Sequence, residues 1–151
     1  VLERYRHDPE IRDTIAMKVC LAQRPDALAF AERALGLRFP GGTTWVASRF
    51  DDDRLAGVAI FTPPEAGSSN LHVAGASPRW FTPTFRQAMF THGFRTLNCS
   101  RLTATVVDGN EACLRLTQRV GFRKEGYMRG FAFGDLHVFG MVKGESPWAD
   151  L

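Results

Sequence analysis

The segment from residue 101 to residue 122 constrains the fold of this chain most, because its side-chain periodicity changes within it. Residues 101–107 alternate between polar and apolar side chains, the period of a β-strand with one buried face. Asn110 then supplies a helix N-cap, and Gly121 supplies a C-terminal stop. The segment therefore predicts a strand followed by a short amphipathic helix, as in a mixed α/β domain.

The rest of the chain predicts further elements on both sides of this segment. A first helix is expected to begin at Asp8-Pro9, with Ile11, Ile15 and Val19 on its apolar face. The other predicted helices and strands cover residues 28–35 (helix), 44–50, 55–61 and 71–74 (strands), 82–97 (helix), and 126–133 and 136–142 (a hairpin turning at Gly134-Asp135).

Composition is that of one globular domain, which we place at residues 1–151. The hydrophobic content is 44% and the charged content 23%, both ordinary for a folded chain. The net charge of +3 comes without any basic run, so nucleic acid is not an expected partner. Three widely spaced cysteines and the lack of a long apolar run predict free thiols in a soluble, cytoplasmic protein.

The segment from Asn110 to Gly121-Phe122, followed by Glu125-Gly126, resembles the GNAT superfamily of N-acetyltransferases in its residue spacing. The following hairpin and the tail over residues 144–148 are similar to small acetyltransferase-like proteins of bacteriophages. The resemblance spans residues 44–145. It implies a mixed, mostly antiparallel sheet of six to seven strands flanked by helices, in the order ααβββαβαββ.

The resemblance also implies where a cosubstrate binds. In that fold the fourth and fifth strands diverge, and the pantetheine arm of an acyl-CoA pairs with the exposed strand edge. Here the fourth strand is residues 70–75, and its edge is His72 with Val73, Ala74 and Gly75. A strand N–H at this edge would stabilise the oxyanion formed during acyl transfer.

The loop over residues 76–84 would hold the pyrophosphate, with contacts from Arg79, Trp80, Thr82 and Thr84 and from the N-terminus of the following helix. The resemblance also implies that Asn110 contacts the cosubstrate. The loop departs from the family pattern Arg-x-x-Gly-x-Gly, whose glycines allow the backbone to wrap closely around phosphates.

Two residues are candidates for proton transfer. His72 could act as general base, although a structural strand histidine is an equally good interpretation. Thr117 occupies the position where many family members carry a tyrosine that protonates the leaving thiolate. The acids at residues 51–53 could bind a divalent cation, but a polar turn explains them more simply, so no metal site is predicted.

These observations favour an acyl-CoA-dependent N-acyltransferase that uses acetyl-CoA as cosubstrate and an amine-bearing small molecule or protein as acceptor. In the family the terminal hairpin often contributes to a homodimer. Two alternatives stay open. The chain could be a binding or regulatory module without transferase activity, or an enzyme that uses a donor other than CoA.

Overall fold

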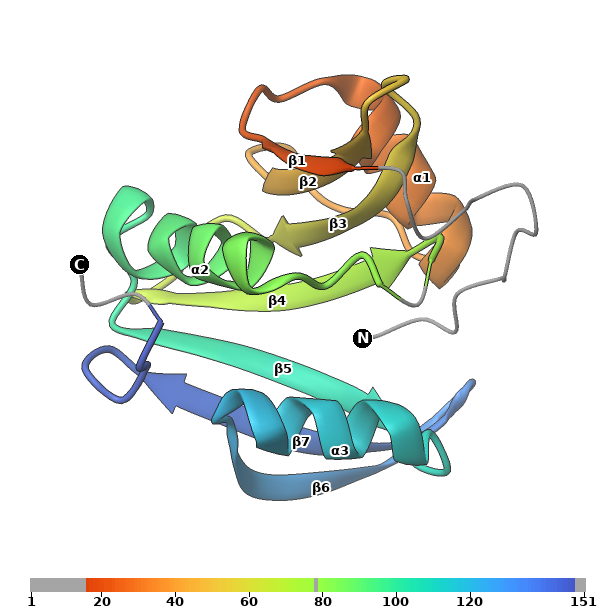
Figure 1. The fold of residues 1–151 in the computed structure, drawn as a ribbon. Helices are drawn as coiled ribbons and strands as arrows, with labels where there is room; N and C mark the ends of the chain where they lie inside the picture. Colours follow the sequence, from red (N-terminus) through yellow and green to blue (C-terminus); the bar gives the residue numbers. More distant parts are fainter. Residues whose placement is uncertain (1–15, 78, 149–151) are drawn as a thin grey trace.

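Seven strands form one sheet, in the order β1-β2-β3-β4-β5-β7-β6, in a computed structural model that describes residues 16–77 and 79–148. All neighbouring strands are antiparallel except β4 and β5, which are parallel (Figure 1). The strands are β1 (Met17–Cys20), β2 (Thr44–Phe50), β3 (Leu55–Phe61), β4 (Ser68–Gly75), β5 (Arg101–Val107), β6 (Arg123–Phe131) and β7 (Gly134–Val142). The helices are α1 (Pro25–Leu35), α2 (Pro83–Thr91), the π-helical turn η1 (His92–Thr96) and α3 (Glu111–Val120).

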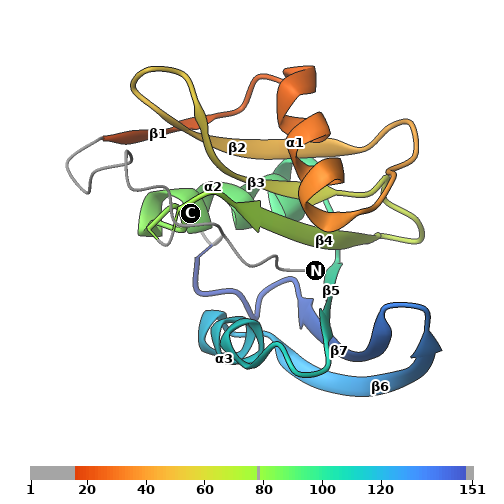
Figure 2. The same cartoon turned by 90° about the vertical axis from the view of Figure 1, so that its right-hand side faces the viewer.

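Helices cover both faces of the sheet (Figures 1 and 2). On one face, Ala27 and Ala31 of α1 pack against Trp45, Val58 and Ile60. On the other face, α2, η1 and α3 bury a larger core, with side chains that include Phe61, Phe85, Phe94, Leu102 and Phe139. Side chains alternate between the two cores along β3 and β4, as the strand period requires.

The predicted helix boundaries at Thr82, Asn110 and Gly121 are confirmed. The Thr82 hydroxyl oxygen accepts a hydrogen bond from the Phe85 N–H at 3.1 Å, which caps α2. The Asn110 side chain accepts one from the Cys113 N–H at 3.3 Å and caps α3. Gly121 ends α3 with φ of 113°, a conformation that glycine adopts without strain.

The predicted first helix is wrong at its C-terminal part. Met17–Cys20 is a strand that pairs with β2, so β1 precedes α1 and the described order is βαβββαβαββ with η1 extending α2. Met17 and Val19 are half-buried on the core side of β1. Their spacing of two residues is that of a strand, whereas the spacing of Val19 from Ile15 also allowed a helix. The start of that helix, with Ile11 and Ile15, lies outside the described residues.

The terminal hairpin turns two residues earlier than predicted. Phe131 pairs with Gly134, so Ala132 and Phe133 form the turn, and Gly134 and Asp135 belong to β7. The Asp135 carboxylate accepts hydrogen bonds from the Gly130 N–H at 2.9 Å and the Tyr127 hydroxyl at 2.8 Å, which fixes this end of the hairpin.

Strands β4 and β5 separate after a short paired stretch. Only three residue pairs join them, Ser68–Arg101, Ser69–Leu102 and Asn70–Thr103. Toward their carboxyl ends the two strands diverge, while β4 stays paired with β3 and β5 with β7 (Figure 1). This divergence splits the sheet and creates the cleft described next.

Candidate functional site

A cleft with a volume of about 50 Å³ lies where β4 and β5 diverge, on the face covered by α2 and α3. Its lining is almost entirely apolar and comes from β4, β5, α2, α3 and the loop before α2. The lining residues are Leu71, Val73, Phe81, Met89, Ala104, Thr105, Val106, Cys113, Leu116, Thr117, Val120 and Phe122. Such a cleft suits a narrow, uncharged chain.

The side of β4 that faces the cleft presents backbone groups for pairing. The Asn70 carbonyl accepts from the Thr62 N–H, and the Ala76 N–H donates to the Ala56 carbonyl, so even-numbered residues of this segment bond toward β3. The N–H and C=O groups of Val73 and Gly75 therefore point toward β5, which no longer pairs there. Val73 and Gly75 thus form the edge expected from the sequence, whereas the backbone of Ala74 bonds with β3.

Trp80 lies in the core beneath the loop, with an exposed fraction of 4%. Its indole covers Gly57 and Gly75, which are direct neighbours across β3 and β4, and a Cβ at either glycine would overlap the ring. Edge-on contacts with Phe81 and Phe85 fix the ring further. The ring thus supports the loop from below and leaves little surface for a ligand to stack on; a direct contact with a ligand stays a prediction.

The predicted phosphate loop ends at the first turn of α2. Pro83 has no N–H, and the Phe85 and Arg86 N–H groups donate to the side chain and the carbonyl of Thr82. Among the described residues, no acceptor engages the Thr84 N–H. This turn therefore retains one N–H group for an anion, at the positive end of the helix dipole.

Arg79 and Thr84 occupy different surroundings. Arg79 is exposed, with its own N–H donating to the Ser77 hydroxyl at 3.3 Å. The Thr84 side chain lines a second hollow of about 590 Å³ between β1 and the outer side of α2. The Thr84 residue thus borders a hollow that is separate from the cleft between β4 and β5.

Thr117 lines the cleft, and its place near the leaving group stays a prediction. Its hydroxyl donates a hydrogen bond of 2.7 Å to the carbonyl of Cys113, one helical turn earlier, and lies 3.9 Å from the Cys113 thiol. The proton of Thr117 is thus held by the helix backbone. Asn110, at the N-terminus of the same helix, uses its side-chain oxygen as the cap.

His72 lies on the opposite face of β4 from the cleft. Its ring packs edge-on against Phe39, with ring centroids 5.1 Å apart, on the side of the sheet covered by α1. Burial lowers the pKa of His72 from its usual 6.5 to about 3. The imidazole is therefore neutral throughout the physiological pH range.

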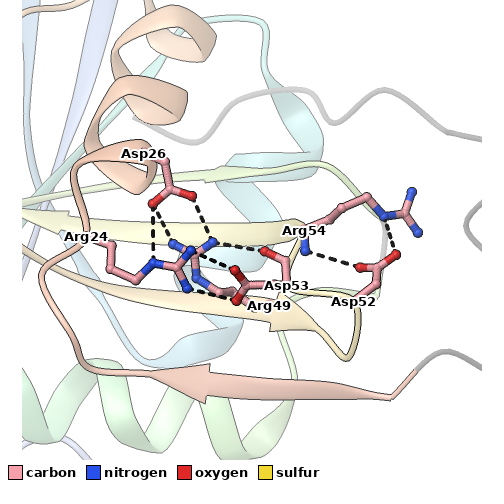
Figure 3. Close-up of polar contacts among 6 residues, drawn as sticks. All are labelled: Arg24, Asp26, Arg49, Asp52, Asp53 and Arg54. Carbon is pink, nitrogen blue, oxygen red and sulfur yellow. Dashed lines mark hydrogen bonds and ion pairs between the residues drawn. The ribbon is translucent and has the colours of Figure 1, made fainter.

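Two of the acids at residues 51–53, Asp52 and Asp53, are engaged by arginines (Figure 3). Asp53 forms two hydrogen bonds with Arg24, at 2.7 and 2.8 Å, and Asp52 accepts from Arg54 at 2.7 Å. In the part of the chain that the structure describes, no three His, Cys, Asp or Glu side chains could hold a metal ion together. The turn interpretation of these acids agrees with this arrangement.

Sequence reasoning missed one wall of the cleft. Met89, Cys113 and Leu116 line it, although the pattern marks such residues only as packing residues of α2 and α3. Cys113 and Thr117 are four residues apart and therefore lie on the same side of α3. This spacing could have indicated that Cys113 shares the cleft with Thr117.

Comparison with solved structures identifies the fold. SpeG, a spermidine/spermine N-acetyltransferase from Vibrio cholerae crystallised with manganese ions, superposes with a TM-score of 0.70 at 13% identity, over 85% of this chain and 94% of that chain. The chain has the N-acetyltransferase fold of the GNAT superfamily. A chimera of Vibrio cholerae SpeG and hSSAT gives a TM-score of 0.69 at 14% identity, over 85% of this chain and 97% of that chain. The dodecameric Vibrio cholerae spermidine N-acetyltransferase gives a TM-score of 0.68 at 12% identity, over 85% of this chain and 95% of that chain.

At these identities the likeness establishes the fold, and no function is carried over by it. No protein-family model and no curated protein matches the sequence. No helix among the described residues is long and apolar enough to cross a membrane.

Proposed function

We propose that this chain is an N-acyltransferase that transfers an acetyl group from acetyl-CoA to an amine. One observation carries the proposal: β4 and β5 diverge, and the free edge of β4 borders a narrow apolar cleft. The pantetheine arm of CoA is itself a narrow chain with two amides, which can pair with a strand edge. Low-identity likeness to N-acetyltransferases of known structure supports the same function.

In this proposal the edge of β4 performs both binding and catalysis. The Val73 and Gly75 backbone groups pair with the pantetheine amides, and the apolar walls exclude water. The nearby strand N–H also stabilises the oxyanion that forms when the amine nitrogen attacks the thioester carbonyl. Collapse of this intermediate breaks the C–S bond, and the thiolate takes up the proton that the amine loses.

His72 has a different role from the one expected of a general base. An imidazole whose pKa is about 3 accepts a proton poorly from an ammonium group. We propose that it accepts a hydrogen bond from the neutral amine on the side of the sheet opposite the CoA cleft. The amine then enters from that side as the free base, and water takes its first proton.

Thr117 lines the acyl end of the cleft and orients the reacting group. Protonation of the thiolate by Thr117 would break its hydrogen bond to the Cys113 carbonyl. A thiolate with a pKa of about 8.5 leaves without help, so the proposal needs no acid at this position.

The acceptor is an amine, and spermidine is the first to test because the solved structures above act on it. Spermidine carries several positive charges and requires carboxylates that are not already paired. In the described residues many carboxylates have a basic partner, including those of Asp26, Asp52, Asp53, Glu125 and Glu145. The acceptor panel therefore includes monoamines beside polyamines.

The function is tested by incubating the purified chain with acetyl-CoA and a panel of monoamines and polyamines, and detecting acetylated product by mass spectrometry. Ala104→Phe, which fills the cleft, is the inactive control, and Ala29→Phe on the half-buried part of α1 is the matched control for added volume. Product that disappears only in Ala104→Phe supports the proposal. Acetyl-CoA binding without any product indicates a binding module instead, and no binding contradicts the proposal.

A further inference from the structure

Arg86 and Trp148 form a stacked pair beside the cleft that the proposed function has not used. The Arg86 guanidinium carbon lies 3.5 Å from the centroid of the Trp148 ring. The Trp148 indole N–H donates a hydrogen bond of 3.0 Å to the carbonyl of Val120, which is itself a cleft residue. The pair therefore joins the first turn of α2 to the end of α3 at the margin of the cleft.

The position of Arg86 is fixed at both ends. Its backbone N–H donates to the Thr82 carbonyl at 2.9 Å, which places it directly after the predicted phosphate loop. At the other end, the face of the guanidinium is occupied by Trp148. Stacking uses only this face and leaves the N–H groups directed within the plane, where they can donate to an anion.

The Arg86 side chain also has a donor to satisfy. Its Nε is buried and has no hydrogen-bond partner among the described residues. A buried guanidinium N–H without an acceptor is unfavourable, and a shift of the side chain that brings this N–H to an anionic oxygen in the plane of the guanidinium would relieve this.

The helices on this face carry an excess of positive charge. Helix α2 and turn η1 contain Arg86 and Arg95 and no acidic residue, and α3 contains Arg115 and Arg119 against Glu111. Such a surface attracts a polyanion, and the nucleotide part of CoA carries three phosphate groups.

We propose that Arg86, held in place by Trp148, is a second cation for the phosphates of acyl-CoA, in addition to Arg79. The inference rests on the proposed function. It explains how a loop that lacks glycines, and that loses a donor at Pro83, could still bind a pyrophosphate. Two arginines on either side of the first turn of α2 would replace backbone N–H groups that the loop does not offer.

The test is calorimetric titration of acetyl-CoA into the full chain and its variants. Arg86→Gln should weaken binding at least tenfold, whereas the control Arg95→Gln should change it by less than threefold. Trp148→Phe keeps an aromatic face under the guanidinium and should stay within threefold of the parent chain, whereas Trp148→Ala should weaken binding at least fivefold. In turnover, Arg86→Gln should raise the KM for acetyl-CoA and leave kcat nearly unchanged.

Equal affinities for the parent chain, Arg86→Gln and Trp148→Ala would overturn the inference and leave the proposed function intact. Absence of binding to the parent chain would overturn both. Circular dichroism establishes that each variant is folded, and if Arg86→Gln is not, Trp148→Ala and Arg86→Lys carry the same prediction. Arg86→Lys keeps the charge without the planar face, so this variant should bind acetyl-CoA less tightly than the parent chain does. It should still bind more tightly than the double variant that carries both Arg86→Lys and Trp148→Ala.

Discussion

The Trp80 indole lies across Gly75, the last residue of β4, so closely that a Cβ there would overlap the ring nitrogen. Gly57, directly opposite on β3, meets the other half of the same indole. The Trp80 side chain thus packs the predicted phosphate loop against the end of β4, and this packing requires glycine at both positions under the indole.

Gly75→Ala is therefore expected to destabilise the protein by about 2 kcal/mol, because the added methyl group forces Trp80 out of its place. Chemical denaturation measures the change in the free energy of unfolding. Gly126→Ala is the matched control, since Gly126 also lies in a strand and a Cβ there would meet no atom within 4 Å. Equal stabilities of the two variants would show that the indole does not lie on Gly75.

The ion pair between Asp26 and Arg49 should contribute more to stability than the exposed pairs around it (Figure 3). Arg49 has an exposed fraction of 1%, and its guanidinium forms two hydrogen bonds with Asp26, at 2.7 and 2.9 Å. Asp26→Asn leaves a buried charge without its counter-ion and should cost about 1–2 kcal/mol, less than for a fully buried pair because Asp26 is exposed.

The control for this prediction is Asp52→Asn, which breaks the exposed pair with Arg54 and should change stability much less than Asp26→Asn does. The two losses are compared in the same denaturation experiment. If Asp52→Asn proves as costly as Asp26→Asn, burial of Arg49 is not what gives this pair its importance.

His72 should make the protein sensitive to mild acid. Burial lowers its pKa to about 3, whereas the unfolded chain takes up a proton near the usual 6.5. The stability that depends on a neutral His72 is complete above pH 6.5 and is lost as the pH falls from 6.5 toward 3. The His72→Phe variant has no group to protonate at this position. Between pH 7.5 and pH 4.5 its free energy of unfolding should therefore fall by about 2 kcal/mol less than that of the parent chain. Parallel stability curves for the two proteins would contradict the neutral, buried state of His72.

Thr117→Val should retain most of the transferase activity. The valine keeps the shape of the side chain, and the lost hydroxyl proton is one that already bonds to the Cys113 carbonyl. We expect kcat to fall by less than tenfold in a steady-state assay of acetyl transfer. A loss of a hundredfold or more would assign Thr117 the role of general acid.

Most of the fold follows from local sequence signals. Thr82, Asn110 and Gly121 mark helix ends because caps depend on one side chain or one φ angle, and both are visible in the sequence. Met17–Cys20 was misassigned because this segment becomes a strand by pairing with β2, which lies about thirty residues further along the chain. Local sequence patterns do not reveal such a distant partner. The turn at Ala132–Phe133 was missed for a similar reason, since it is selected by the hydrogen bonds that the Gly130 N–H and the Tyr127 hydroxyl donate to Asp135.

The free strand edge could be predicted from the sequence, whereas the roles of the candidate site residues stay predictions. The edge of β4 at Val73 and Gly75 follows from the position of the strand in the chain. The orientation of His72 away from the cleft depends on strand register, and the packing of Trp80 depends on glycines in two strands. The contact between Arg86 and Trp148 joins residues from α2 and the C-terminal tail, which no local pattern reveals.

The central claim is that acetyl-CoA binds along the free edge of β4, and amide chemical shifts test it most directly. We would titrate acetyl-CoA into the isotope-labelled chain and follow the backbone N–H signals by NMR. The account predicts that the largest shifts belong to Val73, Gly75 and Thr84, and that they vanish in Ala104→Phe. Saturating shifts at other residues, with Val73 and Gly75 unmoved, would contradict it.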